Sequence, residues 1–284
     1  MSRSSSELLS RGLPILLGSA EARAGVARVA LPSGRLVHGD EGDDEDPALW
    51  VSDGPAGSEL WAALHAAHER TGLWPLLLDS LRGDSRRPWD DGELWPGDMS
   101  SAADGDPGAL LAGWWADYTS IDDDDVLSPA ERRAVTAPYE RRWPGLATPL
   151  PLQHDPGELA QRCAIELLAD RAGLRLGLAA ATRASDAITA AGWQGAVNYV
   201  ADTAHLSAVL RSWEDRFGVR LVGVGFAELY LSVAAPPTSH AEAIRVAAEH
   251  FAFCPDNIWQ GAATNLVDYA KRLINATTWS FWWD

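Results

Sequence analysis

The carboxyl-terminal third of the chain places carboxylate and amide side chains next to tryptophan. The segment Asp256-Asn-Ile-Trp-Gln260 holds one carboxylate and two amides around a tryptophan, and Glu214 directly follows Trp213. Polar groups beside an aromatic ring can orient a ligand in a pocket, and a carboxylate there works as a general acid or base if burial raises its pKa. The same side chains also cap helices and satisfy turns. The candidate binding residues are Trp213, Glu214, Asp256, Asn257, Trp259, Gln260, Trp282 and Trp283.

The abundance of tryptophan supports two interpretations. The chain contains 14 tryptophans and closes with Trp279-Ser-Phe-Trp-Trp-Asp284. Because Trp buries a large apolar area wherever its N–H finds a partner, these residues can complete a hydrophobic core. Trp is also enriched at the centres of protein interfaces, so the same residues can form a binding surface. Burial of the rings distinguishes the two interpretations.

Other side chains that could hold a metal or attack a substrate fit those roles poorly. The segment His65-Ala-Ala-His-Glu69 puts two imidazoles three residues apart, but it lacks the His-Glu-x-x-His spacing of zinc hydrolases and a third ligand. We expect this pair on the exposed side of a helix. His250 and Cys254 are four residues apart, but Pro255 ends the helix, so Cys254 is expected to be a small buried hydrophobe. The sequence therefore predicts no metal site.

Motifs for nucleotide cofactors and for nucleic acid are also lacking. No GxGxxG follows a strand and no GxxxxGK[ST] occurs, so we expect no cofactor. The formal net charge is -17, and two runs at residues 40–46 and 122–125 supply ten of the acids. Without these ten, 30 acids stand against 23 bases, and the arginines are interspersed with acids. A phosphate-binding surface needs clustered basic residues, so nucleic acid is not an expected partner.

Bulk properties indicate a soluble globular protein. The chain has 284 residues, of which 46% are hydrophobic and 22% charged, and no apolar run approaches the roughly 20 residues of a membrane span. Its two cysteines, Cys163 and Cys254, follow no ligand spacing, which is typical of a reducing compartment. We therefore expect a cytoplasmic protein without membrane contact. The sequence leaves the oligomeric state open.

The first part of the chain, residues 1–150, alternates short apolar runs with turn-forming residues. Strands are expected at residues 27–31, 35–37, 48–52 and 73–78, and helices at residues 58–70 and 107–118. Ser58 is the expected cap of the first helix and Gly72 its end. From about residue 82 to residue 151, Gly, Pro, Asp and Arg dominate, and Trp143 beside a Pro-Gly turn is the expected anchor. This pattern predicts a loop-rich α+β region.

The second part, residues 151–284, has a more regular pattern. Strands are expected at residues 174–178, 195–200, 219–225, 228–233 and 279–283, and helices at residues 154–172, 185–191, 203–217, 239–253 and 265–275. The strands at 219–225 and 228–233 form a hairpin, and Ser239 with Glu242 has the spacing of a capping box. The order of elements predicts an α+β domain with a mixed sheet and helices packed mainly on one face.

Four motifs in the second part occur together in one known family. They are Leu210-Arg-Ser-Trp-Glu-Asp-Arg-Phe-Gly218, Ser232-Val-Ala-Ala-Pro-Pro237, His250-Phe-Ala-Phe-Cys-Pro-Asp-Asn-Ile-Trp-Gln-Gly261 and Trp279-Ser-Phe-Trp-Trp-Asp284. In this order they resemble the uncharacterised actinobacterial domain of unknown function 4253. Upstream, Gly72-Leu-Trp-Pro-Leu-Leu-Leu-Asp79 and Trp143-Pro-Gly-Leu146 resemble the region that accompanies the domain. The resemblance implies a shared fold and a cytoplasmic origin in a Streptomyces-like bacterium, and it carries over no activity because the family has no assigned catalytic residues.

These observations lead to one preferred hypothesis of function and two alternatives. The preferred one is a non-catalytic recognition protein, of the immunity or accessory type, whose Trp-rich acidic surface binds a protein or peptide partner. An acidic binder suits a basic partner such as a nuclease toxin. The first alternative is an enzyme or small-ligand protein with a pocket around Asp256, Asn257, Trp259 and Gln260. In the second, the motifs only close the fold.

Overall fold

The computed structural model describes residues 9, 11–13, 29–39, 47–120 and 128–284. The two acidic runs at residues 40–46 and 122–125 lie outside these residues. The strand expected at residues 27–31 lies partly outside them, and its described part, Val29 to Leu31, is not in a strand.

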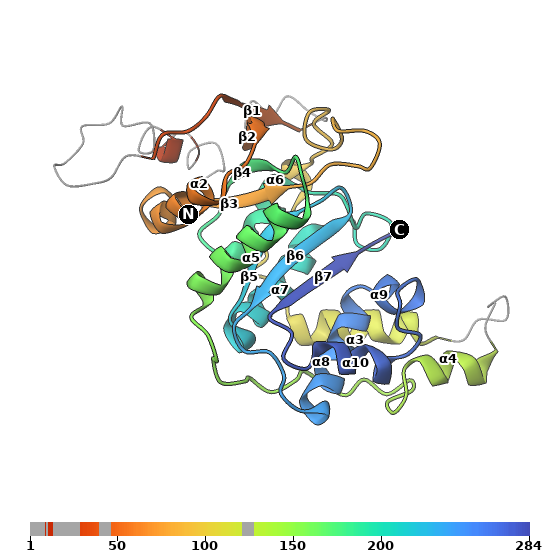
Figure 1. The fold of residues 1–284 in the computed structure, drawn as a ribbon. Coiled ribbons are helices and arrows are strands. Elements are labelled where there is room, and N and C mark those ends of the chain that lie inside the picture. Colours follow the sequence, from red (N-terminus) through yellow and green to blue (C-terminus); the bar gives the residue numbers. More distant parts are fainter. Residues whose placement is uncertain (1–8, 10, 14–28, 40–46, 121–127) are drawn as a thin grey trace.

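The described residues form one seven-stranded sheet (Figure 1). Its strands are β1 (Gly34–His38), β2 (Pro47–Pro55), β3 (Leu73–Leu78), β4 (Arg175–Ala180), β5 (Val219–Val224), β6 (Glu228–Val233) and β7 (Thr278–Trp282). Their order in the sheet is β1-β2-β4-β3-β5-β6-β7. Among the pairs of neighbours, β3 and β5 are parallel and the others antiparallel, so the sheet is mixed.

Helices cover both faces of the sheet. The α-helices are α2 (Ser58–Thr71), α3 (Pro107–Tyr118), α4 (Pro129–Val135), α5 (Pro156–Asp170), α6 (Ala187–Ala191), α7 (Thr203–Phe217), α8 (His240–Phe253), α9 (Asp256–Trp259) and α10 (Leu266–Leu273), and the 3-10 helices are η1 (Pro96–Asp98) and η2 (Ala184–Asp186). Residues of α2 and α5 pack on one face. Residues of α3, α6, α7, α8 and α10 share a larger core with the other face. The predicted α+β class, with helices mainly on one face, is confirmed.

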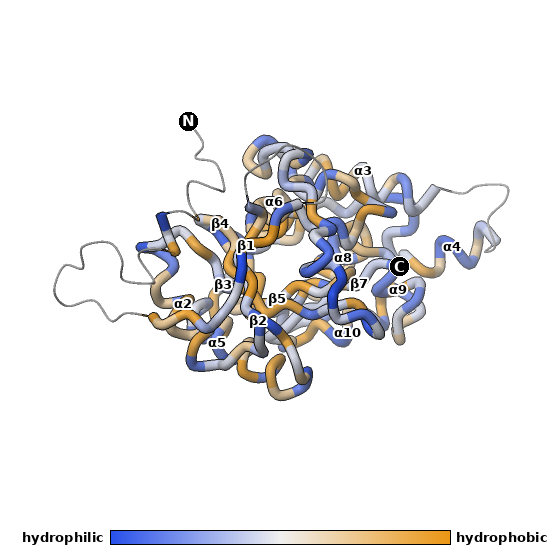
Figure 2. Tube along the Cα trace, turned by 90° about the horizontal axis from the view of Figure 1, so that it is seen from above, coloured by the Kyte–Doolittle hydropathy of each residue, from blue (hydrophilic) through white to orange (hydrophobic). Residues whose placement is uncertain are grey.

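The two cores follow from the alternation of side chains along each strand. On β6, Leu229, Leu231 and Val233 point into the larger core, which leaves Tyr230 on the face that carries α5. Figure 2 shows hydrophobic residues concentrated along the central strands, which are covered on both sides. The edge strand β7 differs, because Trp279 and Phe281 are buried while Thr278, Ser280 and Trp282 are exposed.

Helix ends follow the predicted signals with one exception. Ser239 and Glu242 form the expected capping box at the start of α8, and Asp202 caps α7 by accepting from the N–H of Ala204. Gly218 ends α7 with a φ of 61°, a left-handed conformation that favours glycine. Ser58 is not a cap, because it is the first helical residue and Gly57 occupies the cap position without a side-chain bond.

The prediction of a strand at residues 195–200 was wrong. The segment forms consecutive turns, in which the N–H groups of Val197, Tyr199 and Val200 donate to carbonyls three or four residues earlier. Ala196 and Val200 are buried, and their spacing of four suits a helical turn as well as the alternation of a strand. The predicted loop-rich region does contain η1, α3 and α4, and Trp143 is half-buried with its ring 5.6 Å from that of Trp115.

Strands from before and after residue 150 alternate in the sheet. Strand β4 lies between β2 and β3, and β3 lies between β4 and β5. Residues 1–150 and 151–284 remain the predicted regions of the sequence, but the central pairings of the sheet join them. In the described part of the chain no helix is long and apolar enough to cross a lipid bilayer.

This alternation predicts how a fragment behaves. Residues 151–284 expressed alone should show no cooperative unfolding transition, because β4 loses both of its neighbours and the apolar side chains of β5 become exposed. Urea unfolding followed by circular dichroism, with the full chain as control, measures this. A steep transition of the fragment would show that its four strands suffice.

Candidate functional site

A buried carboxylate lies at the centre of the carboxyl-terminal motifs. Glu249 on α8 has no exposed surface, and both of its oxygens accept hydrogen bonds. The guanidinium of Arg216 donates to both oxygens at 2.8 and 2.6 Å, the indole N–H of Trp213 at 2.7 Å and the backbone N–H of Ala147 at 2.6 Å. A buried charge is tolerated only when it is paired and hydrogen-bonded in this way. Trp213 is therefore a structural residue of the core.

Aromatic rings pack around this network. The ring of Trp213 stacks on Phe281 of β7 with 5.4 Å between centroids and an interplanar angle of 18°, and it also contacts Trp279 and Phe253. Trp283 is 2% exposed, and its ring lies 5.7 Å from that of Trp193. The tryptophans at 213, 279 and 283 thus complete the hydrophobic core. For these three residues the core interpretation of the sequence is correct, and the binding-surface interpretation is not.

His250 is fully buried in the same cluster. Its ring centroid lies 4.4 Å from Trp279 and 4.8 Å from Phe281, and its Nδ1 is 3.1 Å from the hydroxyl of Tyr269. Burial among aromatic rings lowers the pKa of His250 to about 3 because the charged imidazolium loses its hydration. The side chain is therefore neutral at physiological pH.

The amide of Asn257 binds the outer edge of β7. Its Nδ2 donates to the carbonyl of Ser280 at 2.8 Å and to the hydroxyl of Tyr269 at 3.0 Å, and its Oδ1 accepts from the N–H of Trp282 at 3.3 Å. The amide thus replaces a neighbouring strand at this point. The thiol of Cys254 donates to the carbonyl of Trp282 at 2.9 Å, and burial raises its pKa. An edge strand protected by side chains resists pairing with another chain.

Asp256 and Gln260 bind the last residue of the chain. The carboxylate of Asp256 is buried and accepts from the hydroxyl of Tyr199 at 2.9 Å and from the N–H of Asp284 at 3.0 Å. The side-chain amide of Gln260 donates to the carboxylates of Asp256 and Asp284, at 3.2 Å in each case. The polar groups proposed for a pocket are therefore engaged with the end of the chain.

Glu214 does not join this group, although it follows Trp213. It accepts from the hydroxyl of Ser185 at 2.7 Å and pairs with Arg183 and Arg220, both at 3.4 Å. On an α-helix consecutive side chains point about 100° apart, which separates Glu214 from the Trp213 cluster. The eight predicted residues therefore do not form one site.

The two histidines of α2 were predicted on an exposed helix side, and this was wrong. Both are half-buried, with His65 stacked on Trp61 at 5.1 Å and His68 in edge contact with Trp74 at 4.8 Å. The Nε2 of His68 lies 2.8 Å from the carbonyl of Ala181. Burial lowers the pKa of each imidazole. In the described part of the chain, no three His, Cys, Asp or Glu residues gather where they could hold a metal ion.

Two tryptophans of the motifs remain accessible. Trp259 is 36% exposed, contacts Tyr118 and Phe251 at its inner edge, and has the guanidinium carbon of Arg132 5.3 Å from its ring centroid. Trp282 is 38% exposed and points to the face of β7 that carries Ser280. Of these two rings, only that of Trp282 lies on a strand, on the side of β7 that α5 does not cover.

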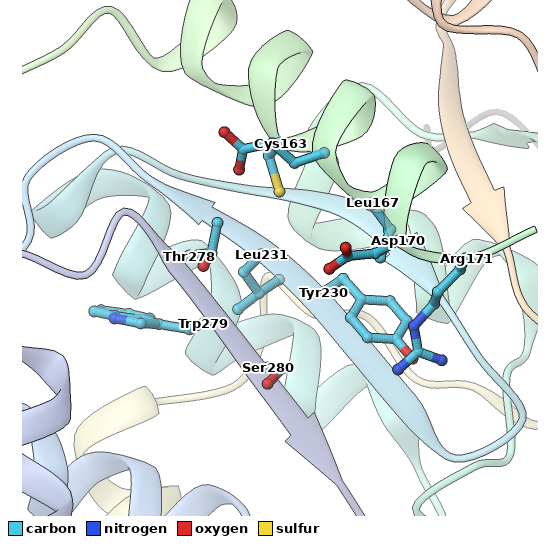
Figure 3. A pocket seen from close by; sticks show the side chains of 10 residues that line it. Cys163, Leu167, Asp170, Arg171, Tyr230, Leu231, Thr278, Trp279 and Ser280 are labelled. Carbon is cyan, nitrogen blue, oxygen red and sulfur yellow. The ribbon is translucent and has the colours of Figure 1, made fainter.

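We call this side of the two strands the β6–β7 face. It consists of Glu228, Tyr230 and Ser232 on β6, of which Tyr230 and Ser232 are buried, and of Thr278, Ser280 and Trp282 on β7, which are exposed. A cavity of about 240 Å³ lies between it and α5 (Figure 3). The helix contributes Cys163, Glu166 and Asp170 to the wall, and Arg171 stands at the end beside Tyr230. Sequence reasoning missed this cavity. The alternation of Thr278, Ser280 and Trp282 with buried rings was the one available signal.

The electrostatics of the cavity are dominated by carboxylates. Glu166 and Asp170 are exposed, and the nearby Arg171 already pairs with Asp79 at 2.5 Å. Burial raises the pKa of the Tyr230 phenol, and Glu228 raises it further. Burial also raises the pKa of Cys163 to about 12, so this thiol stays protonated and is a poor nucleophile. The exposed carboxylates and the protonated thiol therefore favour binding of a cation over covalent chemistry.

Comparison with known proteins identifies one part of the chain. Residues 175–284 match the model of a domain of unknown function, DUF4253, and this part of the chain is a DUF4253 domain. The match begins at the first residue of β4 and includes the β6–β7 face. Neither the curated proteins nor the solved structures contain a significant match.

Replacing Asn257 tests its role at the strand edge. We predict that Asn257→Leu lowers the free energy of unfolding by about 2–4 kcal/mol, because three hydrogen bonds are lost at about 1 kcal/mol each. It should also increase self-association through the uncovered edge. Urea unfolding and light scattering measure the two effects. Asn198→Ala, which removes one exposed bond to the carbonyl of Asp284, is the control. Equal effects of the two variants would contradict this role.

The lowered pKa of His250 predicts a loss of stability in acid. Because the folded-state pKa of about 3 lies below the ordinary 6.5, the unfolded chain binds this proton first as the pH falls. The contribution of His250 is therefore constant above about pH 6.5, and below it stability falls by about 1.4 kcal/mol per pH unit. Urea unfolding between pH 4 and 7 should show a shallower pH dependence in His250→Phe. An unchanged slope would contradict the assignment.

Proposed function

We propose that this protein is a non-catalytic recognition protein, of the immunity or accessory type, whose DUF4253 domain binds a protein or peptide partner at the β6–β7 face. The observation that carries the proposal is the exposed ring of Trp282 beside a cavity with excess carboxylate. Aromatic anchors of this kind supply much of the energy at protein interfaces. The acidic wall favours a basic partner segment and disfavours nucleic acid.

Of the eight residues predicted to bind a ligand or partner, the proposal keeps Trp282 as the anchor. Trp213 and Trp283 are buried, and Asp256, Asn257 and Gln260 hold the end of the chain through hydrogen bonds. A ligand at those groups would have to replace internal bonds, so a pocket around them has less support. Trp282 needs no such replacement, because 38% of its surface is already exposed.

The cellular setting is part of the same proposal. Cys163 and Cys254 are both buried as free thiols, which supports a reducing compartment such as the cytoplasm of an actinobacterium. Their burial and raised pKa values also argue against a cysteine nucleophile. A binding role therefore needs no reactive group from this chain.

Peptides selected from a random library on the wild-type protein test the proposal. We predict that Trp282→Ser weakens their binding by about 30-fold, corresponding to about 2 kcal/mol, because the ring is the anchor of the interface. Fluorescence anisotropy measures the affinity, and thermal unfolding checks that the variant is folded. Trp259→Ser, with a ring of similar exposure on α9, is the matched control. Failure to select binders, or a loss confined to Trp259→Ser, would contradict the proposal.

A further inference from the structure

The cavity beside the β6–β7 face carries negative charge, which favours a cationic ligand. Glu166 and Asp170 lie on the α5 wall, and within the described residues no ion pair neutralises either of them. Glu228 and Asp79 also act on Tyr230 at the cavity's end, where Arg171 is the one base among the lining residues. Glu166 and Asp170 line the cavity without an ion pair, whereas the guanidinium of Arg171 is paired with Asp79. Charge complementarity calls for a cationic ligand.

The spacing of the two wall carboxylates suits an extended chain. Glu166 and Asp170 are four residues apart on α5, which corresponds to an axial rise of about 6 Å. Side chains two residues apart on one side of a strand are separated by about 6.6–6.8 Å. Figure 3 shows α5 and β7 running along opposite sides of the cavity. Alternate side chains of an extended segment lying between them would therefore meet the two carboxylates in turn.

The cavity already shows how a guanidinium fits this floor. The guanidinium carbon of Arg171 lies 4.8 Å from the ring centroid of Tyr230. Tyr230 is 9% exposed, and its hydroxyl has no hydrogen-bond partner among the described residues. A guanidinium offers five donors in a planar fork, which suits carboxylates and hydroxyls better than the single point charge of an ammonium group. Ser280 and Thr278 add hydroxyl acceptors across the floor.

The edge of the sheet limits how the segment binds. The carbonyl of Ser280 and the N–H of Trp282 are both occupied by Asn257, and the carbonyl of Trp282 accepts from Cys254. A partner therefore does not extend the sheet as an eighth strand at these residues. It lies across the face and is recognised through its side chains.

We infer that the cavity binds an extended Arg-x-Arg segment of the partner, with one arginine at Glu166, the next at Asp170 and the neighbouring chain against Trp282. This inference rests on the proposed function, and it adds the chemistry of the ligand. Each arginine forms charge-assisted hydrogen bonds to its carboxylate. Arg171 is a competing charge at the rim.

The probe is the peptide acetyl-Ser-Arg-Ser-Arg-Ser-amide, compared with the same peptide carrying citrulline, which has the shape of arginine without its charge. Isothermal titration with the full chain measures both. We expect saturable binding of the arginine peptide and at least tenfold weaker binding of the citrulline peptide. Equal binding of the two peptides, or no saturable binding of the first, would overturn the inference.

Three variants localise the charge effect. The double variant Glu166→Gln, Asp170→Asn should weaken binding at least fivefold, while Arg171→Gln should strengthen it because a like charge is removed and Asp79 is released. The control Asp104→Asn, Asp117→Asn makes the same change in net charge at exposed residues before and on α3. An equal loss in the control variant would show non-specific attraction to an acidic protein and overturn the inference.

The outcome also separates this inference from the proposed function. Library peptides that need Trp282 but carry no Arg-x-Arg pattern, together with a failed titration, would leave the recognition role standing and remove its ligand. If instead the arginine peptide binds saturably and Trp282→Ser has no effect on the library peptides, the arginine site stands. The proposed anchor role of Trp282 is then removed. Thermal unfolding of each variant confirms that the exposed substitutions leave the fold intact.

Discussion

The buried carboxylate of Glu249 is the constraint on which the carboxyl-terminal half depends. Four donors from Arg216, Trp213 and Ala147 surround it without solvent. Removal of any one donor would leave part of a buried charge unsatisfied, at a cost of several kcal/mol for the guanidinium. The network joins α7, α8 and the segment around Ala147, and its hydrogen bonds fix how these elements are placed relative to one another. That position places the ring of Trp213 where β7 can pack on it.

The edge strand β7 follows from this arrangement. Phe281 stacks on Trp213, and Asn257 holds the strand from its outer side. With alternate residues committed to the core, Ser280 and Trp282 must face the other way. Both side chains stay accessible, and Ser280 lines the cavity next to α5. The same rings that close the fold therefore determine where an uncovered surface remains.

Much of the fold could be predicted from the sequence because its signals are local. The capping box at Ser239, the glycine at 218 and the alternation along residues 228–233 each depend on neighbours within a few positions. The candidate site depended on distant contacts. Adjacency suggested that Trp213 and Glu214 act together, but helix geometry turns them to different surroundings. The cavity wall comes from residues 163–170, more than a hundred positions before β7, and no local pattern joins them.

Fluorine NMR of protein labelled with 5-fluorotryptophan tests the division between structural and recognition tryptophans in one measurement. Each of the 14 indoles gives a signal that single Trp→Phe variants assign. On addition of acetyl-Ser-Arg-Ser-Arg-Ser-amide, the signal of Trp282 should shift in a saturable manner, while those of Trp213, Trp279 and Trp283 stay in place. A shift centred on Trp259 or on the buried rings, with Trp282 unmoved, would contradict the account.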